Sequence, residues 1–255
     1  MAIVLDNPFK AALAAGRPQI GLWNSLCSPV ATELVADSGF DWLMFDTEHS
    51  PVEIAGLYQL LQAAARGSAH PVVRPAWNDP VMIKRILDIG AQTLLVPFVQ
   101  DAGEAARAVA ATRYPPAGMR GVAGMSRATR YGRVANYAAT AADHICVLVQ
   151  VETGEALDHL ADIAAVEGVD GVFIGPSDLA ASLGHLGNPG HPEVQASIRR
   201  AAETLRLAGR PAGILATKRD DARRYLDWGF VFVAAGTDVG LLAEAADDLA
   251  RTMRP

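Results

Sequence analysis

The chain has 255 residues, 51% of them hydrophobic and 20% charged, with a formal net charge of −6. This acidic balance argues against a nucleic-acid-binding surface, which needs clustered Lys and Arg. Two cysteines, Cys27 and Cys146, are too few for a disulfide scaffold or a thiolate metal site. The sequence has neither a signal-peptide pattern nor an apolar run of about 20 residues, so it predicts a cytoplasmic protein that does not cross a membrane.

Short apolar runs alternate along the chain with longer, Ala-rich stretches of helical period. The runs predicted as strands are 20–23, 42–46, 71–74, 93–97, 145–152, 171–175, 212–215 and 231–235. The stretches predicted as helices are 29–38, 51–66, 80–88, 102–112, 155–164, 193–207, 220–228 and 239–252. Pro29, Pro51 and Pro80 suit helical first turns, and Asp79 and Asp220 are predicted N-caps.

Strict alternation of strand and helix predicts a parallel sheet, and eight such units close most naturally into a (βα)8 TIM barrel. Runs such as Leu94, Leu95 and Val96 are apolar without alternation, which is typical of strands buried on both faces. The alternative is a doubly wound open sheet, which usually has fewer strands and a Gly-rich first turn. Residues 23–27 contain no Gly. We therefore predict one barrel domain over residues 1–255.

Two segments fall outside the eight units. Residues 7–15 are predicted to form a helix that caps the bottom of the barrel. Residues 114–143 form a long insert that is rich in Arg and Gly and has no strand of its own. Because the insert follows a helix, it starts at the bottom of its own barrel. It is therefore either a solvated surface loop or a contribution to the site of a neighbouring subunit.

Polar side chains gather where the predicted strands end, which is the active-site face of this fold. In chain order, these strand ends carry Trp23, the block from Asp46 to His49, Arg74, Gln150, Glu152, Ser177, Asp178 and Leu215. This convergence of groups suited to acid–base work, metal binding and anion binding is the main functional signal in the sequence.

Glu152 and Asp178 end neighbouring strands and present two carboxylates to the same rim. Two hard oxygen ligands without a Cys or His cluster suit Mg²⁺, Mn²⁺ or Co²⁺. The alternative is structural, with Asp178 capping a helix and Glu152 pairing with an arginine. The backbone N–H groups around Ser177 and Asp178 would also suit a substrate carboxylate.

His49 is the leading candidate for a general base, because neighbouring carboxylates can set its tautomer and pKa. His185 and His191, in the loop after the sixth strand, remain competitors. Arg74 at the end of the third strand suits stabilisation of an oxyanion, with a surface ion pair as the alternative. Lys218 is the only lysine near the rim, and its charged surroundings argue against Schiff-base chemistry.

Several blocks resemble the HpcH/HpaI aldolase family, and the likeness extends over nearly the whole chain. The blocks are residues 39–49, 71–75, 92–97, 113–116 and the highly specific 168–179, which reads Gly-Val-Asp-Gly-Val-Phe-Ile-Gly-Pro-Ser-Asp-Leu. The resemblance implies a (βα)8 barrel, a trimer-of-dimers hexamer and a bound Mg²⁺, Mn²⁺ or Co²⁺. It also implies reversible aldol cleavage of a 4-hydroxy-2-oxo acid to pyruvate and an aldehyde, with hydroxypyruvate as an alternative donor.

Matched position by position, the resemblance implies roles for seven residues. The metal ligands are Glu152 and Asp178, the substrate-binding residues are Gln150 and Ser177, and the catalytic residues are His49, Arg74 and Asp88. Asp88 is the acidic partner of the catalytic histidine in this scheme, but it ends a helix that should run to the barrel bottom. Either a neighbouring subunit brings in this residue, or Asp46 is the local partner. We expect Trp23 and Leu215 to line the aldehyde end of the site.

Two alternatives to an aldolase remain. One is an acyl-CoA lyase of the citrate lyase β type, which would need a basic path for the phosphates of coenzyme A that this rim does not offer. The other is a metabolite-binding barrel without turnover, against which the full set of rim residues argues.

Overall fold

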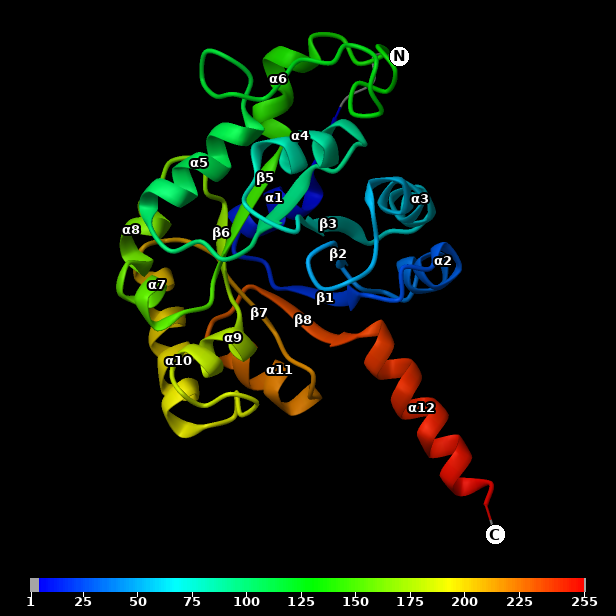
Figure 1. Cartoon of the computed structure of the whole chain (residues 1–255), viewed down its shortest axis with the longest axis vertical. Coiled ribbons are helices and arrows are strands. Elements are labelled where there is room, and N and C mark those ends of the chain that lie inside the picture. The colour runs from blue at the N-terminus through cyan, green and yellow to red at the C-terminus, as the bar shows by residue number, and fades with distance from the viewer. Residues whose placement is uncertain (1–4, 255) are drawn as a thin grey trace.

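The computed structural model describes residues 5–254, and its centre is a closed parallel barrel with strands in the order β1 to β8. The strands are β1 (Gln19–Asn24), β2 (Trp42–Asp46), β3 (His70–Arg74), β4 (Thr93–Val96), β5 (Cys146–Val151), β6 (Gly171–Ile174), β7 (Ala212–Leu215) and β8 (Phe232–Thr237). The predicted single-domain (βα)8 barrel is therefore confirmed (Figure 1).

Helices connect consecutive strands and surround most of the barrel (Figure 1). They are α1 (Pro8–Ala14), α2 (Pro29–Ala36), α3 (Ile54–Ala64), α4 (Pro80–Asp88), α5 (Ala102–Thr112), α6 (Tyr137–His144), α7 (Gly154–Asp158), α8 (Leu160–Ala165), α9 (Pro176–Ser182), α10 (Pro192–Leu207), α11 (Arg219–Asp227) and α12 (Asp238–Thr252).

The predicted elements differ from the observed ones mainly in short helices. The segment predicted as one helix over 155–164 is split into α7 and α8 at His159, and α6 and α9 were not among the predicted helices. Asp79 is confirmed as an N-cap, since its side chain accepts from the backbone of Val81 and Met82. The N-cap prediction for Asp220 is wrong, because α11 already begins at Arg219 and Asp220 lies within its first turn.

Aromatic side chains fill the lower half of the barrel interior. Phe9 from α1 stacks on the His70 ring at 5.7 Å and also contacts Trp42 and Phe232. Gly21 and Gly213 leave room for these rings, because a Cβ atom at either position would collide with Trp42 or Phe232. The barrel is thus a packed core at this end, and polar side chains are left to the opposite end.

The insert is anchored to the barrel by arginines. The Arg120 side chain is fully buried, lies 4.7 Å from the Tyr114 ring and pairs with Asp88 at 2.9 Å. Arg127 donates to the backbone carbonyls of Ile89 and Leu61. The insert is therefore not simply a solvated surface loop where these arginines anchor it. A buried guanidinium is stable only when charged or polar partners compensate for the loss of water, as Asp88 does for Arg120. The tip of the insert nevertheless exposes large apolar side chains, namely Met119, Val122 and Met125.

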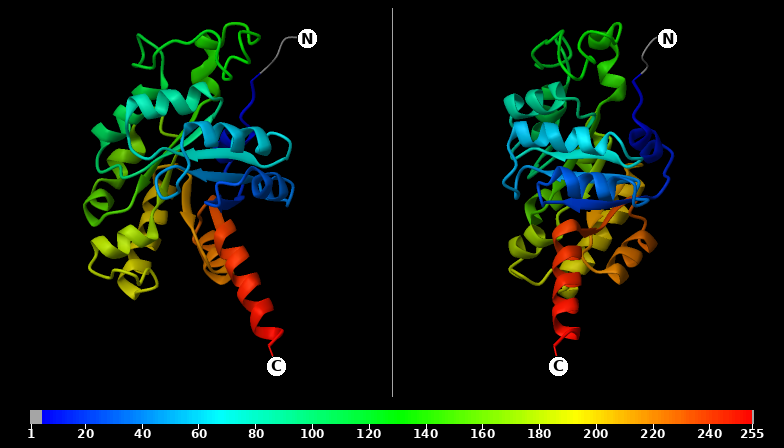
Figure 2. Two further views of the ribbon diagram at one scale, coloured as in Figure 1. Left: turned by 45° about the vertical axis from the view of Figure 1, so that its right-hand side comes forward. Right: turned by 90° about the vertical axis from the view of Figure 1, so that its right-hand side faces the viewer.

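The last helix, α12, extends away from the barrel instead of packing against it (Figures 1 and 2). Asp238 is its only buried residue, while Leu241, Leu242 and Leu249 are 47–63% exposed. A helix that buries no apolar face gains little stability from its own chain. Within residues 5–254, no helix combines the length and the apolar character needed to cross a bilayer.

Candidate active site

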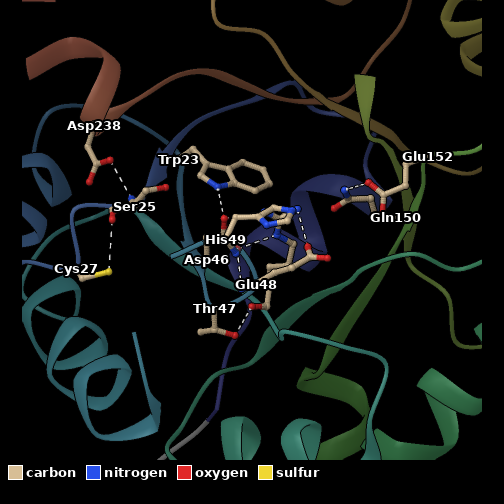
Figure 3. Close-up of polar contacts among 11 residues, drawn as sticks. Trp23, Ser25, Cys27, Asp46, Thr47, Glu48, His49, Gln150, Glu152 and Asp238 are labelled. Atoms are coloured by element: carbon tan, nitrogen blue, oxygen red, sulfur yellow. Dashed lines mark hydrogen bonds and ion pairs between the residues drawn. The ribbon is translucent and has the colours of Figure 1, made fainter. Parts of the chain in front are cut away.

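The carboxyl ends of β2, β3 and β5 bring most of the predicted site residues together. The parallel register of β2 and β3 pairs Asp46 with Arg74 at the same level of the barrel. In Figure 3, Asp46, Glu48 and His49 lie on one side, and Gln150 and Glu152 at the end of β5 lie on the other. The rim therefore collects acidic, basic and amide groups from strands that are distant in sequence.

Arg74 is buried and is the organising cation of this rim. Its Nε and Nη2 donate to the Asp46 carboxylate at 2.9 and 2.6 Å, and its Nη1 lies 2.9 Å from Glu48 Oε2. The guanidinium also covers the Trp23 ring at 4.8 Å. Trp23 in turn donates from Nε1 to Asp46 at 3.2 Å. The alternative of a surface ion pair for Arg74 is wrong, because its side chain is only 6% exposed.

Asp46 fixes the backbone that carries His49 rather than the His49 ring itself. Its Oδ1 accepts from the backbone N–H groups of Glu48 and His49 at 3.0 and 3.3 Å. The His49 side chain is exposed at the rim, and the hydrogen bonds of the described residues include none to its ring. Asp46 therefore positions His49 through the main chain and is not the partner of its imidazole in this chain.

Glu152 is held by hydrogen bonds from two different segments. Its Oε2 accepts from Gln150 Nε2 at 2.5 Å, and its Oε1 accepts from the backbone N–H of Phe98 at 3.0 Å. Phe98 adopts a left-handed backbone conformation, with φ of 53°, which is uncommon for a bulky residue. Gly175 is required at the end of β6, because a Cβ atom there would lie only 2.5 Å from Glu152 Oε2.

The rim carries more negative charge than Arg74 can balance. Burial, together with the carboxylates of Asp178 and Glu48, raises the pKa of Glu152 to about 7. Burial likewise raises the pKa of Glu48, with Arg74 opposing the shift. Burial opposes ionisation of Asp46 as well, but the hydrogen bonds and charge of Arg74 outweigh it and hold the pKa of Asp46 below its usual value.

Three other predicted residues lie beside this cluster, and their side chains are more exposed than those of Arg74, Asp46 and Glu152. Ser177 and Asp178 are exposed in the first turn of α9, and Leu215 is half-buried at the end of β7. Trp23 is 95% buried and contacts Arg74, Asp46 and Phe173, so it supports the Arg74 side chain as well as bordering the cluster.

Asp88 is not part of this cluster within one chain. It ends α4 and pairs with Arg120 of the insert, at the end of the barrel opposite to the rim. His185 and His191 also lie outside the cluster. They belong to the loop between α9 and α10, where they contact each other and Glu193.

The sequence placed Glu48 among the rim residues without a role of its own, and its pattern indicated no role for Phe98, Gly175 or Asp238. Asp238 is buried and accepts from the backbone N–H groups of Ser25 and Leu26, which fixes the loop after β1 (Figure 3). Only Glu48 carried a usable signal, because it stands in the charged block that follows β2. The other three act through backbone contacts, which leave little trace in a sequence pattern.

Comparison with known proteins identifies the family of this barrel. Residues 19–245 match the sequence profile described as HpcH/HpaI aldolase/citrate lyase. The chain belongs to this family. It is thus an enzyme of the aldolase type within the lyases, and the resemblance found in its sequence is confirmed.

Relatives of this HpcH/HpaI protein agree in both sequence and structure. The chain is 57% identical over 247 residues to a 4-hydroxy-2-oxo-heptane-1,7-dioate aldolase of Klebsiella pneumoniae, covering 96% of this chain and 93% of the relative. A crystal structure of an HpcH/HpaI aldolase/citrate lyase family protein from Burkholderia cenocepacia superposes with a TM-score of 0.95 at 40% identity, covering 98% and 100% of the two chains. The citrate lyase β subunit of M. tuberculosis is only 18% identical, with a TM-score of 0.57 over 88% of this chain and 92% of that one, and shares the fold alone.

The donor set of this HpcH/HpaI rim fits a divalent cation. Glu48 Oε2 and Gln150 Oε1 are buried without a hydrogen bond from any described residue, and the contact of Glu48 with Arg74 is an ion pair only. Carboxylate and amide oxygens are the ligands that hard cations prefer. A cation at Glu152 and Asp178 would also offset the repulsion that raises the pKa of Glu152.

We predict that Glu152→Gln stabilises the metal-free protein above neutral pH. As the pH rises from about 4.5 to about 7, Glu152 ionises in the unfolded chain but keeps its proton in the folded chain. The free energy of unfolding of the wild-type protein therefore falls over this range. Glutamine does not titrate, so the variant does not lose stability over this range. Above pH 7 its free energy of unfolding should exceed that of the wild-type protein by roughly 3 kcal/mol.

Denaturant unfolding between pH 4.5 and 8.5 in the presence of a chelator measures this difference. The control is Glu155→Gln, which removes an exposed carboxylate three residues away and should leave the pH profile unchanged. Identical pH profiles for wild type and Glu152→Gln would show that Glu152 ionises normally in the folded protein.

Proposed function

We propose that the protein reversibly cleaves 4-hydroxy-2-oxo acids to pyruvate, or hydroxypyruvate, and an aldehyde, with Mg²⁺, Mn²⁺ or Co²⁺ as cofactor. The observation that carries this proposal is the cluster of buried carboxylate and amide oxygens beside a buried arginine at the barrel rim. The name of the Klebsiella relative, which is 57% identical, supports the same reaction.

Glu152 and Asp178 are the proposed metal ligands, with Gln150 beside them. When bound, the cation would act as a Lewis acid on the keto oxygen and carboxylate of the donor. Arg74 supplies a fixed positive charge next to Glu48 and Glu152, and it stabilises the negative charge that develops on the keto oxygen when the C–C bond breaks. Because Asp46 and Trp23 already hold the guanidinium in place, it needs no reorganisation during the reaction.

His49 is the proposed general base. Its exposed ring projects from a backbone that Asp46 holds by two hydrogen bonds, so the imidazole is free to exchange a proton with substrate or water. In cleavage it takes the proton of the C4 hydroxyl, and in synthesis it returns that proton. Ser177, exposed at the start of α9, is the proposed contact for the donor carboxylate.

The aldehyde end of the site is proposed to be bordered by Leu215 and Trp23. Apolar walls discriminate weakly, since one methylene is worth only about 1–3 kcal/mol in such a pocket. We therefore infer a strict requirement for a 2-oxo acid donor and tolerance among small aldehydes. The substrates are small molecules. We also propose a cytoplasmic location, which suits the free cysteines Cys27 and Cys146.

An aldol assay with both donors and a panel of aldehydes tests the reaction and its metal dependence. A chelator should abolish turnover, and Mn²⁺, Co²⁺ or Mg²⁺ should restore it. Arg74→Ala should reduce both cleavage and pyruvate C3 proton exchange by about 10²-fold or more. His49→Ala should reduce cleavage by about 10²–10⁴-fold.

His159→Ala is the matched control for loss of a histidine, because its side chain is exposed at the junction of α7 and α8. Full turnover after exhaustive chelation, with cyanoborohydride trapping pyruvate on Lys218, would contradict the metal-dependent mechanism.

We further propose that the protein is a homo-oligomer, a hexamer built from dimers, in which α12 packs onto a second copy. In a complete barrel the eighth helix covers the outer faces of β8 and β1, next to the first and seventh barrel helices. In this chain α12 points away from the barrel and does not occupy that position. Val30 and Leu34 of α2 are 76% and 72% exposed as a result. The α12 of a second copy has the complementary apolar side chains to cover this region, and the reciprocal exchange closes a two-fold dimer.

Replacing Leu242 and Leu249 of α12 by Lys should therefore weaken assembly. Each leucine loses about 1.5–3 kcal/mol of burial against the second copy. Light scattering should show smaller particles for this variant, and Glu244→Lys should assemble as wild type, because Glu244 lies about half a turn away from Leu242 on the helix. An active wild-type monomer at assay concentration would rule out the proposed exchange.

The same assembly offers Asp88 a route to catalysis. Asp88 and Arg120 lie at the end of the barrel away from their own rim, so we propose that they serve His49 of a neighbouring copy. His49→Ala and Asp88→Asn should then each be inactive alone but complement each other when co-assembled. Random mixing of equal amounts should restore up to roughly a quarter of wild-type activity.

The control mixture combines His49→Ala with Arg74→Ala. Both changes affect the same rim of one chain, so no hybrid assembly contains an intact site. If the first mixture recovers no more activity than the control mixture, Asp88 does not act across a subunit boundary.

A further inference from the structure

Three possible metal ligands come together in the loop between α9 and α10 and in the first turn of α10. Figure 1 shows where this loop lies. Its backbone folds back on itself, with the N–H of Asn188 donating to the carbonyl of His185 at 2.9 Å and the N–H of His191 donating to the carbonyl of Asn188 at 3.0 Å. Gly184 and Gly187 have φ of 82° and 76°, which only glycine adopts without strain. The two ends of the loop are thereby held side by side.

The ligands in question are His185, His191 and Glu193. The Nε2 of His185 lies 2.8 Å from Glu193 Oε2, and the two imidazole rings stack with centroids 3.5 Å apart and planes 17° apart. One ligand atom from each of the three residues lies within 4.8 Å of the other two. In a site with metal–nitrogen distances of about 2.0–2.1 Å, ligand atoms are separated by roughly 3.3 Å, so closing this set around one ion requires the stacked imidazole rings to rotate until their nitrogen lone pairs converge.

Hydrogen bonding alone gives a weak explanation for the arrangement. A solvent-exposed His–Glu pair contributes about 0–1 kcal/mol, and the Glu193 side chain is 60% exposed. The hydrogen bond from the Glu193 N–H to His191 Nδ1 is long, at 3.3 Å. The two rings already lie at stacking distance, and the neutral imidazole is the form that binds metals.

We propose that His185, His191 and Glu193 form a second metal site, which takes a Zn²⁺-class ion. Two imidazole nitrogens and one carboxylate oxygen suit Zn²⁺, whereas the all-oxygen set of Glu152 and Asp178 suits harder cations. The site lies on the catalytic face, because barrel helices begin at the end where the strands finish. It lies in the outer ring, however, on the connection between α9 and α10.

The proposed role of this ion is structural. It joins the start of α10 to the loop that follows α9, whose first turn carries Ser177 and Asp178. Leu183 at the end of α9 packs against the core, and Gln195 of α10 donates to the carbonyl of Pro189 at 2.8 Å. A bound ion would add a third connection to these two and hold the loop against thermal opening.

Zinc binding to the full-length protein in the Glu152→Gln background tests the proposal, because that background weakens the rim site. After equilibration with Zn²⁺ and gel filtration, elemental analysis should find one zinc per chain. His185→Gln, His191→Gln and Glu193→Gln should each bind Zn²⁺ at least about tenfold more weakly, because even the loss of an outer-shell partner costs about 10–100-fold in metal affinity. Glu193→Gln is the most informative variant, because glutamine removes the charged metal ligand but can still accept the hydrogen bond from His185.

His159→Gln is the control and should bind zinc as its parent does. Zn²⁺ should raise the melting temperature of this control but not that of the three ligand variants. In the otherwise wild-type chain, His185→Gln should keep full Mn²⁺-supported turnover, so the result is independent of the proposed aldol reaction. Equal zinc content and affinity in the parent and all three ligand variants would overturn the proposal.

Discussion

One buried guanidinium, that of Arg74, balances part of the negative charge at the barrel rim. Asp46 and Glu48 contact it directly, the charge of Arg74 also reaches Glu152, and Asp178 lies close enough to repel Glu152 and Glu48. Arg74 holds the pKa of Asp46 low, whereas burial keeps the pKa values of Glu48 and Glu152 raised. The folded chain therefore carries an electrostatic cost that a bound cation would relieve, which is a common arrangement at functional sites.

The barrel architecture makes this arrangement possible by separating its two ends. Aromatic rings from α1, β2 and β8 fill the lower interior, and Gly21 and Gly213 give them the space they need. The upper end is left to polar side chains from several strands. Glu152 receives hydrogen bonds from β5 itself and from the loop after β4, and Gly175, which follows β6, makes room for it. Such support from several segments fixes catalytic groups within narrow limits.

Two features of the single chain are only partly explained within it. The apolar side of α12 faces solvent, and the ion pair of Asp88 with the buried Arg120 lies at the end of the barrel away from the rim. Both features become intelligible if neighbouring copies of the chain supply the missing surfaces. The cluster of His185, His191 and Glu193 is different, because its three ligands come from one loop and the helix that follows it, so it needs no second copy.

The sequence by itself determined the fold and most of the rim. Eight apolar runs alternating with helical stretches specify a parallel barrel, and that topology places His49, Arg74, Glu152 and Asp178 at one end, because all strands run in the same direction.

Only the tertiary structure decided how these residues pair. Arg74 binds Asp46 and Glu48, Asp46 binds the backbone of His49, and Asp88 binds Arg120. The left-handed backbone of Phe98, the space beside Gly175 and the outward path of α12 were equally absent from the pattern. The physical reason is that periodicity records which face of an element is buried, whereas side-chain partners depend on strand register, loop geometry and packing between segments that are distant in the chain.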